Sequence, residues 1–209
     1  MYQPEHFRED RPEVIHQLIR SHPLGLLVTC GEDGPDANPV PFELVVDRKR
    51  TVLKAHLARA NQSWKTIRDH PERRLLAVFQ GPQAYVTPSW YPSKQEHGKV
   101  VPTWNYAIVQ AKGRASIFEE PEALLAHLNA LTDHQEEPRS TAWKVGDAPD
   151  DFIARQMRGI VGIAIEVETL EGKWKMSQNK SDADRIGVSD GYEADANSDL
   201  AALVRGGAG

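Results

Sequence analysis

Residues 25–47, GLLVTCGEDGPDANPVPFELVVD, contain two apolar runs separated by a stretch rich in Gly, Asp and Pro. The runs, Leu24–Cys30 and Val40–Val46, are typical of two strands joined by a loop. After a turn at residues 47–50, a third strand is expected over residues 51–57. Three short strands at regular spacing predict a β-sandwich or a β-barrel.

Outward from this meander, the pattern alternates further strands with short helices. Helices are expected over residues 10–22, 61–69, 120–131 and 149–157, and strands over residues 75–79, 84–87, 104–117, 161–167 and 174–177. Turns are expected at Gly81–Pro82 and Gly172, and an irregular segment at residues 88–103. We therefore predict a mainly β chain with inserted helices, one domain over residues 1–191, and a weakly ordered tail over residues 192–209.

Composition excludes several classes of protein. The net charge of −5 gives no general attraction to nucleic acid or to an anionic membrane. The single cysteine, Cys30, cannot form an intrachain disulfide, and its place at the end of an apolar run predicts a small buried residue. No window approaches the roughly 18 apolar residues of a membrane span, and the N-terminus has no apolar signal core. A cytoplasmic location is expected.

Common chemical motifs are missing from the sequence. We find no glycine-rich nucleotide-binding loop, no nucleophile elbow and no His-Glu-x-x-His motif. The eight histidines are scattered, so no metal site is predicted. The nearest pair of helices that could form a DNA-reading unit has an acidic first helix and a long connection.

Three segments are harder to explain by packing alone. The first is KAHLARANQSW, residues 54–64, where a strand end delivers His56, Arg59, Asn61 and Ser63 to the start of a helix. Such donors could cradle a phosphate. A surface strand edge followed by a capped helix explains the same residues.

The second segment, residues 80–106, gathers five aromatic rings, and the third, residues 171–185, gathers basic side chains. The rings are Tyr85, Trp90, Tyr91, Trp104 and Tyr106, and the polar and basic side chains are Lys173, Lys175, Ser177, Gln178, Asn179, Lys180 and Arg185. The rings need a partner subunit or a flat ligand to cover them. The basic segment is either a solvated strand and turn or a set of donors for an anionic or amide-rich ligand.

Several long phrases resemble one known family over nearly the whole chain, from Met1 to about Gly191. They include YQPEHF, HPLGLLVT, HLARAN, VFQGPQAYVTPSWYPSK, HGKVVPTWNY, LEGKWKMSQN and ADRIGV. The sequence is similar to the PaiB-like family of FMN-binding negative transcriptional regulators. It departs from that pattern at Pro39, where His is usual, and at Lys180, where Arg is frequent.

The resemblance implies a six-stranded antiparallel Greek-key split β-barrel, related to pyridoxamine-phosphate oxidase. It also implies a homodimer with FMN sites at the interface. By residue-level carry-over, the FMN phosphate falls on His56, Arg59, Asn61 and Ser63. Trp90, Tyr91, Trp104 and Asn105 are expected near the flavin ring or across the interface, and Lys175, Ser177, Gln178 and Asn179 are further candidates, contributed by either chain.

Three functions follow from this resemblance and from the residues. The first is negative transcriptional regulation, direct or indirect, and DNA enters as a partner only on this account. The alternative is an FMN-dependent oxidoreductase acting on a small molecule, because the cofactor carries the redox chemistry and the protein positions it. His97 and Tyr91 are then candidate general acids. The third is a haem-binding or haem-degrading split barrel with His56 or His97 as ligand.

Overall fold

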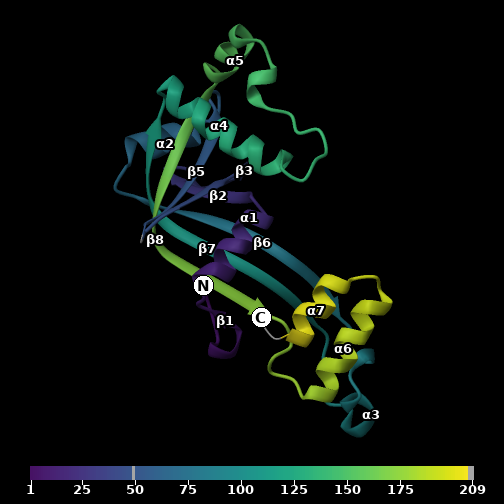
Figure 1. Cartoon of the computed structure of the whole chain (residues 1–209). Helices are drawn as coiled ribbons and strands as arrows, with labels where there is room; N and C mark the ends of the chain where they lie inside the picture. The colour runs from purple at the N-terminus through teal and green to yellow at the C-terminus, as the bar shows by residue number, and fades with distance from the viewer. Residues whose placement is uncertain (49, 207–209) are drawn as a thin grey trace. The chain divides into compact units, whose positions relative to one another are not determined.

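The computed structural model describes residues 1–48 and 50–206, and Figure 1 shows the course of the chain. These residues form two compact units. The central unit contains residues 19–79 and 110–170 within the described range. The terminal unit contains residues 1–18, 80–109 and 171–206. Each unit is therefore built from separate stretches of sequence.

One antiparallel sheet supplies most of the framework. Its strands are β1 (Arg8–Glu9), β2 (Leu24–Gly31), β3 (Gly34–Pro41), β4 (Glu43–Asp47), β5 (Arg50–Ala58), β6 (Arg74–Val86), β7 (Thr103–Phe118) and β8 (Ile160–Lys175). The hydrogen-bonded order is β3-β2-β6-β7-β8-β5-β4, with β1 paired to β8. The β2–β3, β2–β6, β4–β5, β5–β8 and β1–β8 ladders are antiparallel. The predicted antiparallel sheet with helices is confirmed. Its eight strands do not close into a ring within the described residues, so the six-stranded barrel stays a prediction.

The helices follow the sequence pattern where an apolar stripe is present. They are α1 (Pro12–Ser21), α2 (Ser63–Asp69), α3 (Ser93–His97), α4 (Pro121–Glu136), α5 (Asp150–Met157), α6 (Asp182–Ala194) and α7 (Ser198–Gly206), with short 3₁₀ turns at Glu5–Phe7, Pro88–Trp90 and Val145–Asp147. The four predicted helices correspond to α1, α2, α4 and α5. In α4 the buried face includes Leu124 and His127, whereas Leu125 is 37% exposed. A histidine thus occupies an interior position of a leucine-rich helix.

The Gly-, Asp- and Pro-rich stretch predicted as a loop is the strand β3. Pro39 lies opposite Leu26 in the β2–β3 ladder. β3 is at one end of the strand order, where an edge strand tolerates prolines because one side of its backbone needs no ladder partner. The predicted turn at residues 47–50 includes residue 49, which lies outside the described residues.

Two glycines predicted as turns lie inside continuous strands of the terminal unit. A Cβ at Gly81 would lie 2.8 Å from a methyl carbon of Leu18, and a Cβ at Gly172 would lie 2.9 Å from Ile15. The glycines therefore allow α1 to approach the sheet closely. The predictions of turns at Gly81–Pro82 and Gly172 were wrong for this packing reason.

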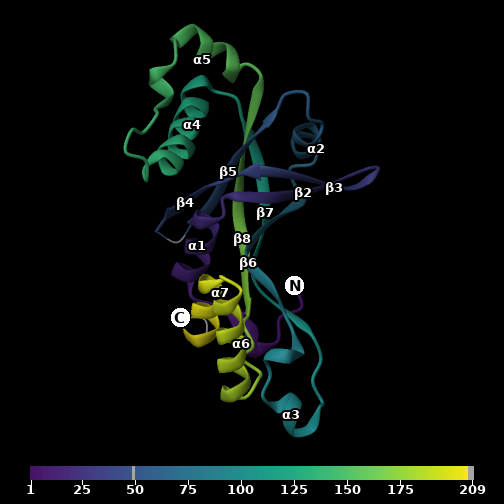
Figure 2. The same cartoon turned by 90° about the vertical axis from the view of Figure 1, so that its right-hand side faces the viewer.

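The C-terminal segment differs from the expected weakly ordered tail. Helices α6 and α7 lie side by side in both views (Figures 1 and 2), and they meet over extensive backbone contacts. Leu200, Ala201 and Val204 on α7 are buried. An apolar stripe therefore orders residues whose Ala, Asp and Gly content had suggested a tail; residues 207–209 of that prediction lie outside the described range.

Cys30 is exposed, contrary to the expectation of a buried residue. Side chains alternate along β2, and the neighbouring Thr29 takes the interior position with an exposure of 3%. Among the helices of the described residues, none is long and apolar enough to cross a membrane.

Candidate functional site

A polar network ties β3 to the start of α2 in the central unit. Ser63 Oγ donates to Asp36 Oδ2 at 2.7 Å, and Asn38 Nδ2 donates to the same oxygen at 2.9 Å. Asn61 Nδ2 donates to Asn38 Oδ1 at 2.8 Å, and Asn61 Oδ1 accepts the backbone N–H of Ser63 at 2.9 Å. The hydrogen bonds from Ser63 and Asn38 lower the pKa of Asp36. Ser63 thus already donates to a carboxylate of the protein itself, and Asn61 holds Asn38, the second donor to that carboxylate.

Arg59 comes directly after β5, two residues before Asn61. Its guanidinium donates to the carbonyl oxygens of Arg158 at 3.1 Å and Ile160 at 3.2 Å, and it pairs with Glu119 at 2.6 Å. Its side chain keeps 43% of its exposure. Arg59 is therefore braced against the chain while part of its fork of donors still faces solvent.

Two further cations surround the same indole ring as Arg59. Arg59 Cζ, Lys65 Nζ and Arg68 Cζ lie 6.0, 5.8 and 5.1 Å from the centroid of Trp64. Trp64 is buried, and its Nε1 donates to Arg59 O at 2.9 Å. Arg68 pairs with Asp69 at 2.8 Å. A fixed ring thus gathers three positive charges at one end of the sheet.

His56 belongs to a different arrangement. Its Nδ1 lies 3.2 Å from His127 Nε2, and His127 Nδ1 lies 2.8 Å from Glu43 Oε2. The His127 side chain is fully buried. Burial first, and the neighbouring charge of His127 second, lower the pKa of His56. A carboxylate and two imidazoles therefore form a continuous hydrogen-bonded chain.

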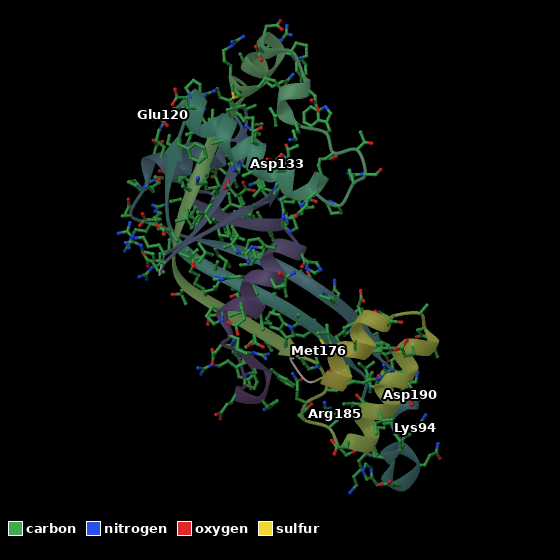
Figure 3. All side chains as sticks on the ribbon, viewed as in Figure 1. Lys94, Glu120, Asp133, Met176, Arg185 and Asp190 are labelled. Carbon is green, nitrogen blue, oxygen red and sulfur yellow. The ribbon has the colours of Figure 1, made fainter. Side chains whose placement is uncertain are left out.

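This chain ends at a pocket of about 560 Å³ within the central unit. Its wall includes His56, Leu24 and Pro41 from the strands, Leu128 and Leu131 from α4, and Trp143 from the loop that follows. The second half of α4, where Asp133 is labelled in Figure 3, contributes most of the helical wall. A mostly apolar pocket with one oriented imidazole can hold a small molecule.

In the terminal unit, Trp90 and Tyr91 are anchored by packing. A Cβ at Gly191 would come within 2.2 Å of the Trp90 ring, so this ring lies directly on a glycine of α6. Tyr91 is 2% exposed, and burial raises the pKa of its phenol. Asp184 of α6 accepts hydrogen bonds from both the backbone N–H and the hydroxyl of Ser93. The segment predicted as irregular is thus docked on α6, the helix on which Figure 3 labels Arg185 and Asp190.

Asn105, Ser177 and Lys175 form a second polar group in the terminal unit. Ser177, in the left-handed region with φ of 63°, donates to Asn105 Oδ1 at 3.1 Å. Lys175 Nζ donates to Thr103 Oγ1 and Trp104 O. Burial lowers the pKa of Lys175, and nearby lysines add to the effect. The group is basic and internally hydrogen-bonded.

The remaining candidates of the terminal unit have separate places. Gln178 braces the backbone by accepting from Met176 N and donating to Trp174 O, and Asn179 is exposed. Trp104 is 54% exposed and meets Tyr85, itself 46% exposed, edge to face at 6.0 Å. Only this last pair shows the open aromatic surface that the sequence suggested.

The predicted site residues thus fall into two sets. His56, Arg59, Asn61 and Ser63 lie in the central unit, and Trp90, Tyr91, Trp104, Asn105, Lys175, Ser177, Gln178 and Asn179 lie in the terminal unit. Glu43 and His127 were not predicted, because they are far apart in sequence. The sequence pattern alone does not join them. Lys65 and Arg68 were not predicted either, although their spacing of three on a helix was a readable signal. Within residues 1–48 and 50–206, no group of three or more His, Cys, Asp or Glu is arranged to hold a metal ion.

Comparison with known proteins gives a family and a shared fold. A family model described as "Putative FMN-binding domain" matches residues 1–169. Protein AN0679 of Emericella nidulans is 34% identical, over 94% of this chain and 93% of its own length. Protease synthase and sporulation protein PAI 2 of Bacillus subtilis is 29% identical, over 94% and 91%.

Among solved structures, the FAD and heme binding protein from Mycobacterium smegmatis aligns with a TM-score of 0.59. The alignment covers 80% of this chain and 73% of that chain at 16% identity. At this identity the likeness concerns the fold alone.

Proposed function

The chain belongs to the family of FMN-binding domains, as its sequence phrases predicted, and we propose that it is an FMN-dependent oxidoreductase acting on a small molecule. FMN is its cofactor. When bound, the flavin supplies the redox chemistry, while the protein binds, orients and shields it. The observation that carries the proposal is the gathering of Arg59, Lys65 and Arg68 around Trp64, inside the part of the chain that the family model matches.

These cations suit the phosphate of FMN. Arg59 offers a planar fork of donors, and its bonds to two carbonyl oxygens fix the direction of that fork. Asn61 and Ser63 would then act as positioning residues, because the bond of Ser63 to Asp36 and the bonds of Asn61 to Asn38 and to the Ser63 backbone hold the loop between β5 and α2. The hydrogen bonds of His56 lead to His127 and Glu43 and not to the cations around Trp64. We therefore leave His56 out of the phosphate site.

The experiment compares FMN with riboflavin, which lacks the phosphate, by titration of flavin fluorescence. We expect Arg59→Ala to weaken FMN binding about 10- to 100-fold, as for the loss of a charged hydrogen bond of about 1.5–3 kcal/mol. Riboflavin binding should change little. Arg155→Ala is the matched control, because Arg155 also lies against an aromatic ring, Phe152, at 5.8 Å. Equal FMN affinity of the wild type and Arg59→Ala would remove Arg59 from the phosphate site.

Lys175→Ala tests whether the cation that binds the FMN phosphate lies in the central unit or in the terminal unit. If Lys175→Ala, and not Arg59→Ala, removes the preference for FMN over riboflavin, the phosphate belongs to the basic group of the terminal unit. The proposed phosphate site would then be refuted, while FMN binding itself would stand.

A homodimer with FMN at its interface is part of the proposal. The exposed pair Tyr85 and Trp104 supports it, because large rings are costly to leave in water. Sedimentation analysis of Trp104→Glu should show a shift toward monomer. An unchanged dimer would exclude this surface.

Negative regulation of transcription is the second candidate, favoured by the 29% identity to the sporulation protein PAI 2 of Bacillus subtilis. The net charge of −5 opposes a general affinity for DNA, so we propose that any regulation is indirect. Salt-dependent retention on duplex DNA tests this point. A steep salt slope with sequence preference would support direct repression instead. Haem binding is a third prediction, and a shifted Soret band on titration with haemin would favour it.

A further inference from the structure

The pocket of the central unit contains a chemical group that the phosphate proposal leaves unused. Glu43, His127 and His56 form a hydrogen-bonded chain that starts at a carboxylate and ends at the pocket wall. His127 is fully buried, so its ring is held between its two partners. The positions of the protons along these hydrogen bonds determine whether His56 donates to a ligand or accepts from it.

With Glu43 ionised and both imidazoles neutral, one arrangement of protons satisfies every hydrogen bond. A carboxylate only accepts, so His127 Nδ1 carries a proton and donates to Glu43. His127 Nε2 then has a lone pair and accepts from His56 Nδ1. His56 Nε2 is left with a lone pair. Among the hydrogen bonds of residues 1–48 and 50–206, the His56 ring takes part through Nδ1, and His56 belongs to the pocket wall.

The rest of the wall restricts the ligand to a neutral and largely apolar molecule. The lining is mostly apolar, and Leu24, Leu128, Leu131 and Trp143 belong to it. The described lining residues include no Lys or Arg to balance an anion, and they include Glu136. A volume of about 560 Å³ is enough for a molecule of one to three rings.

We propose that this pocket binds a neutral, ring-containing small molecule through a hydroxyl or N–H group that donates a hydrogen bond to His56 Nε2. The same geometry lets His56 accept a proton from that group, since His56 Nδ1 can pass its own proton to His127 and His127 can pass one to Glu43. Glu43 and His127 are positioning residues, because they fix which nitrogen of His56 faces the ligand. The binding site stands on this geometry alone and does not rest on the proposed phosphate site.

The test uses the full-length protein saturated with FMN and two probes of similar size. 2-Naphthol has a hydroxyl donor, and 2-methoxynaphthalene has the same rings without one. Calorimetric titration should show 2-naphthol binding about 5- to 10-fold more tightly, the ratio that corresponds to one hydrogen bond of about 1–1.4 kcal/mol. His56→Leu should reduce this ratio to about one. His6→Leu, at an exposed histidine of the terminal unit, should leave the ratio unchanged.

Thr132→Trp provides a variant that does not disturb the core, because Thr132 is a half-exposed residue of the pocket wall. The indole would fill the pocket, and both probes should lose binding. Retained binding in this variant would place the probe elsewhere and overturn the proposal. Equal affinity of the wild type for the two probes would also overturn it, as would a ratio that survives His56→Leu.

Repeating the titration without FMN shows whether FMN itself occupies the pocket. We expect the same 2-naphthol affinity with and without the cofactor. Binding only to the FMN-free protein would assign the pocket to the flavin and overturn the inference, while the proposed oxidoreductase function would remain. Failure of FMN to bind at all would refute the proposed function and leave the pocket to be judged by the two probes.

Discussion

Replacing His127 by Leu tests whether the buried hydrogen-bonded chain stabilises the central unit. The substitution keeps an apolar side chain of similar volume and removes the bonds of 2.8 Å to Glu43 and 3.2 Å to His56. The bond to a carboxylate contributes about 1.5–3 kcal/mol and the neutral bond about 1 kcal/mol. Because the Glu43 side chain keeps 18% of its exposure, water can solvate part of the freed carboxylate. We therefore expect the free energy of unfolding to fall by about 3 kcal/mol.

The assay is urea denaturation followed by circular dichroism, with an unchanged m value as the sign that the native fold is kept. His134→Leu is the control, because it removes an exposed histidine from the same helix. A double-mutant cycle sharpens the test. Glu43→Leu with His127→Leu should cost about 1–2 kcal/mol less than the sum of the single variants, since no carboxylate is then left without its partner. A loss below about 1 kcal/mol for His127→Leu, or additive costs in the cycle, would refute the reasoning.

Three further predictions concern stability. Gly113→Ala should destabilise the protein by about 3 kcal/mol in urea denaturation, because its Cβ would lie 1.9 Å from the backbone oxygen of Glu166, whereas Gly146→Ala, with open space around it, should change stability by less than about 1 kcal/mol. Trp90→Ala should cost about 3 kcal/mol through the cavity left on α6, and a thermal midpoint equal to that of the wild type would contradict this packing. The lowered pKa of His56 means that below about pH 6.5 the folded protein binds fewer protons than the unfolded chain. Stability should therefore be full above that pH and fall as the pH drops through it, and a pH series of denaturation curves should show this component missing in His56→Leu.

Local pattern was sufficient for α1, α2, α4 and α5 and for much of the sheet. The stripe of α1 and the alternation along β5 and β7 depend on neighbours in the chain, and sequence shows such neighbours directly. Glycine and proline were less reliable as signals of turns and loops. Gly81 and Gly172 lie in strands because α1 approaches them, and Pro39 is tolerated because β3 lies at the sheet edge. Those reasons belong to packing between distant segments.

The candidate site was predicted unevenly for the same reason. Arg59, Asn61 and Ser63 are close in sequence, where a strand is followed by a helix, and they were predicted together. The chain from Glu43 to His56 through His127 joins residues up to 84 positions apart. A lone histidine among the leucines of α4 carries no signal of its partners. Only the packing of that helix on the sheet reveals it.

The distinctive phrases of this sequence contain two kinds of residue. Some are held by interactions inside the protein, and others keep polar atoms that can bind a ligand. Within PSWYPSK, Trp90 is fixed on Gly191 and Ser93 is bound to Asp184, so both side chains have their main interactions inside the protein. Within HLARAN, Arg59 and His56 each keep donors or a lone pair that the protein does not use. A ligand can only be recognised by groups that still have such capacity. The residues that carry function are therefore best sought where a distinctive phrase leaves a polar atom open, and for this reason we propose neighbouring residues of one strand end for the FMN phosphate and the pocket ligand.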